Sequence, residues 1–529
     1  MQIGRKELFT NVPEINYENI IPILRDVFPS HQENANRINF LLEYEAGNQP
    51  LVRKEPKKYR PEIDCQCVDN VANEVTEFNI GFKWGNPITL VQRGEKDSGK
   101  ENEALAISYL NECYETEGIK RKTQTLARFV EISGIGYTYV DVNTEYEEGD
   151  SYFKIEALDP RTTFIVRSSY YFDRRPMLGV AYRTDKHGNR HFTCFSKDLR
   201  FEITNFTEIT NGKSVNVKNP WKHIARSGEV NPLNIIPINE WVRSDDRMGC
   251  FERQISDMDN LNLLISDFTN DVEQNTQAIW HSNDVDFPEE IVTDENGNET
   301  KVTKKPKNNE WLGTFTSRDG KTPFIKPLVI DYDYEGMLNQ IMSRRALILQ
   351  KCNVPQRNDN SGGSTGIAMS DATGWSNAEA IASKQQNIME SCKMNEVKIV
   401  LKAIKISSDI EESNPLLKLR YSDVQPNIKR QKTYEMTAKA NAFATWVSHG
   451  INGLHALKAI NAFEDVNQVW EDSKDTIEKY QESVFDKSST TNNAVGADGE
   501  EKPNADRLEG DNSDQISNSP KIDGNRTDN

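Results

Sequence analysis

The sequence predicts an α+β protein, and three patterns support this fold class. Segments toward both ends of the chain repeat apolar residues at helical spacing. Short runs of β-type residues, separated by turn sequences, fill the region between Ile135 and Trp241. Two further helical segments flank a β-like insert at about 280–329. With 529 residues, 36% of them hydrophobic, the chain is long enough for several domains with sizeable cores.

Helices are expected before the sheet region. Residues 17–48 and residues 65–82 each predict one, and a turn with a strand follows at 85–94. The apolar face of the second helix is formed by Val68, Val71, Val75 and Phe78. The last helix before the sheet is expected from Asn102 to about Glu131. Six short segments between Ile135 and Trp241 then predict an antiparallel sheet, with "DKHGNR" as one of its turns.

A long amphipathic helix is expected over 250–280. Its apolar stripe recurs at threes and fours and consists of Phe251, Ile255, Met258, Leu261, Ile265, Phe268 and Val272. Its other faces carry the acids Glu252, Asp257, Asp259, Asp267, Asp271 and Glu273. The insert after it contains a hairpin signal, "IVTDENGNETKVTKK", and a second helix is expected over 334–352.

A Gly/Ser-rich stretch, "NDNSGGSTGIAMSDATGWS", occupies 358–376 between two helical segments. Structureless loops of this length are uncommon and are usually either functional or disordered. A helix from Asn377 to about Ile406 is expected to start on a capping box formed by Ser376 and Glu379. Helices resume at Ile428 and run to about Phe485, with a break at "HGING", and the acidic tail from Lys487 predicts disorder.

Composition excludes several functional classes. The 64 basic residues are outnumbered by 82 acidic ones, giving a net charge of −18, so the chain should not coat nucleic acid non-specifically. No apolar run reaches the roughly 18 residues of a membrane span, and no signal peptide is recognised. The seven scattered cysteines indicate free thiols in a reducing compartment.

The chemical motifs are weak. The stretch Gly94–Lys100 approaches a phosphate-binding loop, but Glu101 stands where a Ser or Thr hydroxyl is needed. His187, His191 and Cys194 fit a hairpin better than a zinc site, because no second ligand pair completes a tetrahedron. Cys65 and Cys67 are expected to point apart on a helix. The sequence therefore predicts no catalytic residue, no metal site and no cofactor.

Five stretches, in the same order over about 35–480, give the chain a resemblance to the portal proteins of tailed bacteriophages of the siphophage type. They are "FLLEYEAGNQPLVRK", "NVANEVTEFNIGFKWGNPITL", "ALDPRTTFIVRSS", "IPINEWVRSDDRMGCFERQISDMDNLNLLISDFTNDVE" and "GGSTGIAM". In one departure, "SDATGWSN" intervenes where the family continues directly into a helix. The loop is then longer than usual, or the helix starts near Gly366 and kinks.

The resemblance implies a division of the chain into the parts of a portal subunit. The implied parts are an α/β wing at 1–245, a first stem helix at 246–279, a small β-containing clip at 280–330, a second stem helix at 331–352, a tunnel loop at 353–376, a long helix returning to the wing at 377–427, a helical crown at 428–486 and a disordered acidic tail at 487–529. Such subunits form rings, commonly of twelve, at one vertex of the capsid in the virion, after assembly in the bacterial cytoplasm.

The resemblance also implies sites and partners. Double-stranded DNA would pass the tunnel loop, at Asn360, Ser361, Gly362, Gly363, Ser364, Thr365 and Gly366. Candidates for the channel wall are Asp257, Asp259, Asp267, Asp271 and Glu273, with neighbouring subunits or outside solvent as the alternative surroundings of each. Expected protein partners are other copies of the chain, the terminase large subunit, a head-completion adaptor, and the major capsid and scaffolding proteins, with no membrane. An uncharged loop suits a conduit, because a basic loop would gain affinity from counterion release at every phosphate and act as a brake.

Two other functions stay open at this point. One is a different virion structural protein, such as a capsid or scaffold subunit, which the helices around a β insert disfavour. The other is a nucleotide-binding enzyme built on Gly94–Lys100, which Glu95, Asp97 and Glu101 disfavour because carboxylates repel phosphate.

Overall fold

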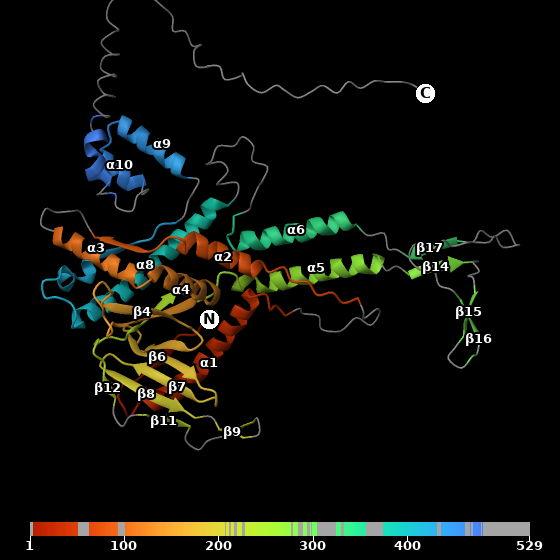
Figure 1. Ribbon diagram of the computed structural model, residues 1–529, viewed down its shortest axis with the longest axis horizontal. Helices are drawn as coiled ribbons and strands as arrows, with labels where there is room; N and C mark the ends of the chain where they lie inside the picture. Colours follow the sequence, from red (N-terminus) through yellow and green to blue (C-terminus); the bar gives the residue numbers. More distant parts are fainter. Residues whose placement is uncertain are drawn as a thin grey trace, which may run out of the picture. The chain divides into compact units, whose positions relative to one another are not determined.

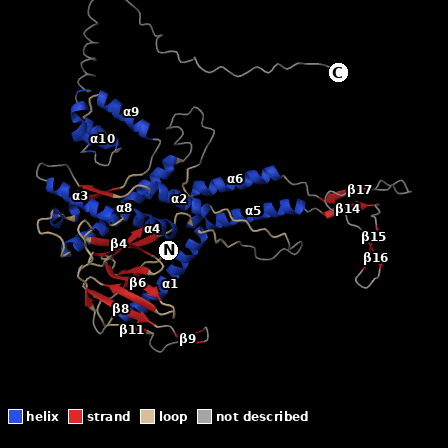
Figure 2. Cartoon of the chain, viewed as in Figure 1, coloured by secondary structure: helices blue, strands red, loops and turns tan. Residues whose placement is uncertain are grey.

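The computed structural model has the α+β architecture that the sequence predicts (Figures 1 and 2). It describes residues 4–50, 63–93, 101–206, 208–210, 213–215, 220–224, 228–276, 279–283, 289–293, 297, 299–303, 324–328, 333–355, 374–430, 435–460, 466, 469–477 and 479. The chain divides into two compact units, Met1–Gln431 and Lys432–Asn529. The predicted tail from Lys487 lies outside the described residues.

A seven-stranded sheet forms one half of the first unit. Its strands are β1 (Leu8–Thr10), β5 (Thr163–Ser168), β6 (Pro176–Thr184), β7 (Arg190–Phe195), β8 (Leu199–Asn205), β11 (Trp221–His223) and β12 (Glu229–Val230). The expected antiparallel pairing is confirmed from β5 to β8, but β1 adds to β5 in parallel, which the sequence did not predict. Helix α1 (Ile20–Glu45) packs its apolar face on this sheet, where Leu24 and Phe28 meet Phe192.

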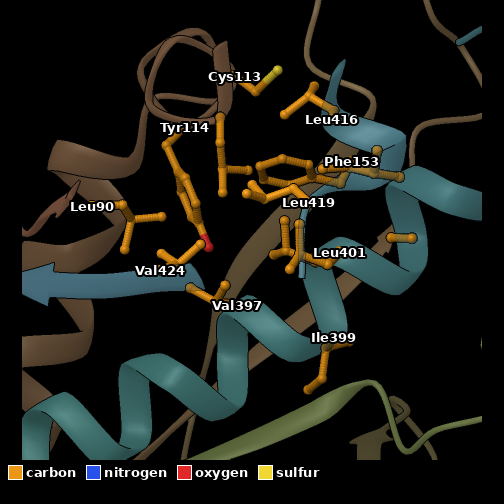
Figure 3. Packing of buried hydrophobic residues seen from close by; sticks show 14 of the residues in the cluster. Leu90, Cys113, Tyr114, Phe153, Val397, Ile399, Leu401, Leu416, Leu419 and Val424 are labelled. Atoms are coloured by element: carbon orange, nitrogen blue, oxygen red, sulfur yellow. The ribbon is translucent and has the colours of Figure 1, made fainter. Parts of the chain in front are cut away.

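A second, three-stranded sheet consists of β13 (Ile238–Val242), β3 (Ile135–Val142) and β4 (Phe153–Leu158). Its core is shared with α3 (Glu101–Thr116) and with the C-terminal half of α8 (Trp375–Ile406). Figure 3 shows Tyr114 and Phe153 in this core beside Val397 and Leu401. The pair β2 (Thr89–Gln92) and β18 (Val424–Asn427) closes it, so segments more than 300 residues apart in sequence fold as one body.

Three expected helices have different boundaries. The helix predicted over 65–82 is α2 (Val71–Trp84), and residues 65–69 are not helical. The helix predicted from Asn102 is two helices, α3 and α4 (Ile119–Ser133), because Gly118 adopts a left-handed φ of +69°. The helix from Asn377 starts earlier, at Trp375, and its N-cap is Gly374 with φ +86° instead of the predicted capping box on Ser376.

The predicted pair of helices around a β insert is confirmed. A 3₁₀ turn (Glu252–Gln254) leads into α5 (Ile255–Thr276), and α6 (Tyr334–Lys351) follows the insert. The expected helix to residue 280 is wrong at its end, because β14 (Ile279–Asn283) pairs with β17 (Phe324–Leu328). The predicted hairpin is β15 (Glu289–Thr293) with β16 (Glu299–Thr303), and a further small hairpin joins β9 (Glu208–Thr210) to β10 (Lys213–Val215).

The prediction that helices resume at Ile428 is wrong, because residues 428–430 are not helical and continue from strand β18, which pairs with β2. Two short 3₁₀ turns, Pro415–Lys418 and Tyr421–Asp423, precede β18. The second unit contains α9 (Glu435–Ser448) and α10 (Gly453–Ile460), separated at the predicted "HGING" break. In α10, Gly453 lies against the indole of Trp470, where a Cβ atom would come within 2.6 Å of the ring.

Candidate functional site

Helices α5 and α6 run antiparallel and lie side by side (Figure 1). Near the sheets, the Lys351 ammonium pairs with the Asp257 carboxylate at 2.6 Å. Farther along, the rings of Phe268 and Tyr334 meet with their centroids 6.0 Å apart. The base of the pair is fixed in an apolar cluster with α1 and α2 that includes Leu41, Val71, Val75, Phe251, Met258, Leu261, Ile341, Ile348 and Leu349.

An extended strap, defined here as Cys65–Asp69, runs along α5. The Cys65 N–H donates to Asn270 Oδ1 at 2.7 Å, the Cys67 N–H to Ser266 Oγ at 3.0 Å, and the Asp69 N–H to Asn262 Oδ1 at 2.9 Å. The spacing of the N–H donors on the strap matches the spacing of the acceptors on α5, because two extended residues advance about 6.6 Å and four helical residues about 6 Å. This ladder is why residues 65–69 are not helical.

The sequence interpretation overlooked the three side chains that hold the strap. Asn262, Ser266 and Asn270 are buried, and they repeat every four residues beside the apolar stripe of α5. Small polar residues at that spacing were the available signal. The guanidinium of Arg345 on α6 contacts Asp69 at 2.9 Å and also pairs with Glu74, so the strap is tied to both helices.

The five acidic candidates on α5 have different surroundings. Asp257 pairs with Lys351, and Asp259 accepts a 2.8 Å hydrogen bond from the Tyr44 hydroxyl. Burial raises the pKa of Asp259, and the bond from Tyr44 opposes this shift only in part. Asp267, Asp271 and Glu273 lie farther along the helix and are half-buried. The structure therefore places all five on one helix, and it shows the contacts of Asp257 with Lys351 and of Asp259 with Tyr44.

The ends of the Gly/Ser-rich loop are held together. Asn360–Gly366, the predicted DNA-facing residues, lie outside the described residues. Before the gap, Val354 is buried in the cluster at the base of α6. After it, Trp375 packs on Phe78 and Phe82 of α2, with ring centroids 5.9 and 5.7 Å apart. The Asn377 amide donates to Asn353 Oδ1 at 2.8 Å, which pins one end to the other.

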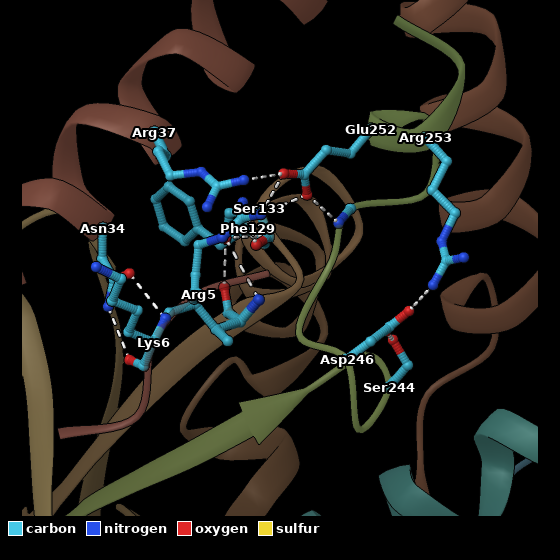
Figure 4. Close-up of polar contacts among 12 residues, drawn as sticks. Arg5, Lys6, Asn34, Arg37, Phe129, Ser133, Ser244, Asp246, Glu252 and Arg253 are labelled. Carbon is cyan, nitrogen blue, oxygen red and sulfur yellow. Dashed lines mark hydrogen bonds and ion pairs between the residues drawn. The ribbon is translucent and has the colours of Figure 1, made fainter. Parts of the chain in front are cut away.

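The start of α5 is locked by the N-terminal segment (Figure 4). The Arg5 guanidinium pairs with the Glu252 carboxylate and donates to the Ser133 carbonyl at 3.0 Å. Arg37 of α1 reaches the same carboxylate at 3.5 Å. Gly4 is required here, because a Cβ atom would lie 2.1 Å from the Asp246 carbonyl oxygen. The N-terminal segment and α1 thus converge on Glu252, in the 3₁₀ turn that leads into α5.

The remaining sequence candidates form no reactive centre in the described part of the chain. Gly94–Lys100 lies outside it. His191 contacts Asp185 and Thr204, each at 3.2 Å, beside the turn that holds His187, and Cys194 is buried in the sheet core. Cys65 and Cys67 do not point apart as predicted, because an extended strap places their Sγ atoms 3.7 Å from each other. Among the described residues, no cluster of three metal-binding side chains occurs and no helix is long and apolar enough to cross a membrane.

Comparison with known proteins gives the family. The model of the family described as "Phage portal protein, SPP1 Gp6-like" matches residues 24–483. A solved structure of the neck of an empty GTA particle is similar over 73% of this chain and 87% of that chain, with 10% sequence identity and a TM-score of 0.33. No curated protein matches. Because the family match spans most of its length, the chain belongs to the SPP1 Gp6-like phage portal proteins, and it is a structural component of the virion and not an enzyme.

Proposed function

We propose that about twelve copies of the chain form a ring at one capsid vertex, through which the genome enters and leaves. The family match over 24–483 is the observation that carries this proposal. On it, residues 1–245 form the wing, the helices within 246–279 and 331–352 the stem, residues 280–330 the clip, residues 377–427 the helix returning to the wing, and residues 428–486 the crown. The α5–α6 pair with its small strand pairs supports the stem and clip assignments.

In this ring, α5 contributes to an acidic channel wall. Carboxylates facing the duplex repel phosphate and keep DNA from adhering to the wall. The candidates for this role are Asp257, Asp259, Asp267, Asp271 and Glu273.

The loop at 353–376 is the part that contacts DNA. The bond between Asn353 and Asn377 supports this role, because it holds the two ends of the loop together. Asn360, Ser361, Ser364 and Thr365 offer neutral hydrogen-bonding groups to phosphates, and Gly362, Gly363 and Gly366 relax the backbone. A neutral loop touches the duplex without gripping it.

The other partners follow from the same assignment. The clip binds the terminase large subunit during packaging and the head-completion adaptor afterwards. The wing faces the major capsid protein, and scaffolding protein assists its incorporation. The proposed location is the portal vertex of the virion.

The ring is tested by measuring the mass of the purified protein and imaging it in the electron microscope. We expect rings with a central hole and a mass near twelve times the 60.4 kDa subunit. Solitary particles without a hole, at the protein concentrations reached late in infection, would contradict the proposal.

The loop assignment is tested by the double substitution Ser361→Lys with Ser364→Lys. Two added cations per subunit should slow DNA packaging at least several-fold by counterion release, while ring assembly is unchanged. Ser413→Lys, at an exposed serine outside the loop, is the matched control and should package at the normal rate. Packaging at the normal rate by the double variant would contradict the proposal that the loop contacts DNA.

A further inference from the structure

Cys65 and Cys67 place two thiols together on the strap. Their Sγ atoms lie 3.7 Å apart, so the two sulfur atoms are in contact. Residues i and i+2 of an extended segment point to the same side, and the strap therefore joins two thiols that a helix would separate. Both side chains are half-buried, whereas four other cysteines are buried, namely Cys113, Cys194, Cys352 and Cys392. We refer to Cys65 and Cys67 as the strap dithiol.

The strap dithiol is held against α5. The Thr269 hydroxyl donates to the Ile265 carbonyl at 2.9 Å, which leaves its oxygen to accept from the Cys67 thiol at 3.6 Å. The N–H groups of both cysteines are bonded to side chains of α5, and this fixes the backbone on either side of Gln66. The two sulfur atoms therefore stay near each other, and little conformational entropy opposes a bond between them.

The spacing of the strap suits a disulfide bond. Two extended residues advance about 6.6 Å, and disulfides join Cα atoms that are usually about 4.4–6.8 Å apart, most often near 5.5–6 Å. Bond formation therefore needs a contraction of roughly 0.6–1 Å, toward the spacing of about 6 Å between successive acceptors on α5. The ladder of hydrogen bonds between the strap and α5 is compatible with this contraction.

The outer edge of the strap is open to small molecules. Burial alternates along it, because Ile63 is buried while Asp64, Gln66 and Val68 are exposed. The exposed residues flank the two half-buried cysteines on both sides. A small thiol reagent therefore reaches the strap dithiol without unfolding of the subunit.

We propose that Cys65 and Cys67 form a disulfide bond when the particle leaves the host cell, and that this bond locks the strap on α5. The chain is a component of the virion, which passes from a reducing cytoplasm, where disulfides are rare, to oxidising surroundings, where they persist. The cross-link leaves a detached strap fewer conformations, so the strap leaves α5 less often.

The oxidant is a low-molecular-weight disulfide. The thiolate of one cysteine attacks a sulfur atom of this small disulfide and releases one small thiol. The thiolate of the other cysteine then attacks the mixed disulfide on the protein and releases the second small thiol. Two S–H bonds of the protein are exchanged for one S–S bond, and both protons go to the departing small thiolates. The strap dithiol is oxidised, and the small disulfide is reduced.

The bond is tested by incubating the full-length protein with oxidised glutathione and measuring the mass of the peptide that contains both cysteines. We expect this peptide to lose the mass of two hydrogen atoms and to regain it with dithiothreitol. Cys65→Ser and Cys67→Ser keep the N–H donors of the strap and should instead stop at a stable mixed disulfide with glutathione. Cys250→Ser, at a half-buried cysteine outside the strap, is the matched control and should form the bond as wild type does.

Hydrogen exchange tests the lock. Amides of the strap should exchange roughly three- to tenfold more slowly in the oxidised than in the reduced protein, while exchange in the sheet core is unchanged. Wild-type protein that stays reduced, or that stops at a mixed disulfide, would overturn the proposed bond. Unchanged or faster exchange of the strap after oxidation would overturn the lock. Neither measurement needs an assembled ring, so these failures are distinguishable from a failure of the proposed function.

Discussion

The sheet region of the first unit and the α5–α6 pair are stabilised differently. In the sheet region, apolar side chains from two sheets and several helices close around each other, as at Phe153 and Phe192. The helix pair is buried mainly at its base, and on α6 it exposes Leu338, Met342 and Leu347. The sheet region thus buries large cores within one chain, whereas the helix pair leaves apolar side chains exposed along α6.

The two regions also differ in the kind of polar group that they bury. The sheet region buries charges and pairs them, as at Glu240, whose carboxylate contacts Arg247 at 2.6 Å and Arg167 at 2.7 Å. Helix α5 buries neutral Asn262, Ser266 and Asn270 and satisfies them with the backbone of the strap. Opening a neutral contact costs less free energy than opening a buried ion pair, because no charge is left unpaired.

The largest expected effect compares one substitution in both regions. Leu178→Ala, in the sheet core with 0% exposure, should lower the free energy of unfolding by about 2–5 kcal/mol, because it removes buried methyl groups and leaves a cavity. Leu347→Ala, 53% exposed on α6, should change it by less than about 0.5 kcal/mol in the unassembled subunit. Urea unfolding measures both free energies. Equal losses in the two variants would contradict the proposed difference between the sheet region and the helix pair.

A pH series sharpens the contrast in buried charge. Burial alone would raise the pKa of Glu240, but the guanidinium groups of Arg247 and Arg167 outweigh it and lower the pKa to about 2, from an ordinary 4.5. A depressed folded pKa contributes stability above the unfolded pKa, and this contribution is lost as the pH falls from about 4.5 toward 2.

Urea unfolding at stepped pH should therefore show the wild-type protein losing roughly 2–3 kcal/mol from this group across that window. The Glu240→Gln variant should be less stable than wild type at neutral pH, and its free energy of unfolding should fall less as the pH is lowered. If the free energy of unfolding falls equally with pH in both proteins, the Arg167–Glu240–Arg247 cluster is not the acid-sensitive element.

The smallest effect concerns the strap. Asn262→Ala removes the acceptor of the Asp69 N–H and should cost about 1–3 kcal/mol locally. Hydrogen exchange at the amides of the strap should accelerate, while exchange in the sheet core stays unchanged. Asn260→Ala, an exposed asparagine on the same helix, is the control and should leave the strap protected.

Much of the fold could be predicted from local pattern. The periods of the apolar residues indicate α1, α5, α6 and the strands from β3 to β8, because each of these elements buries a continuous face of its own. Other boundaries depend on distant partners. The apolar spacing of Val68 with α2 suggested one longer helix, but side chains nearly 200 residues later hold that stretch extended. Gly118 breaks a helical run that periodicity alone continues.

The candidate site was less predictable. The acids of α5 are visible in the sequence, yet the contacts of Asp257 and Asp259 depend on Lys351 and Tyr44, which lie far from them in the chain. The pin between Asn353 and Asn377 joins two residues that no motif relates. The N-terminal lock on Glu252 was equally hidden, because an isolated Arg5 in a short opening segment has no periodic context.

Helix α8 begins beside the pinned loop ends and ends inside the sheet-region core, where Val397 and Leu401 are buried (Figure 3). Its 32 residues contain no proline and extend about 48 Å as one rod. Mechanical load applied at the loop is therefore delivered to a well-packed anchor instead of being absorbed by a hinge. On the proposed function, the force of a moving duplex on the loop is carried along α8 into this buried core.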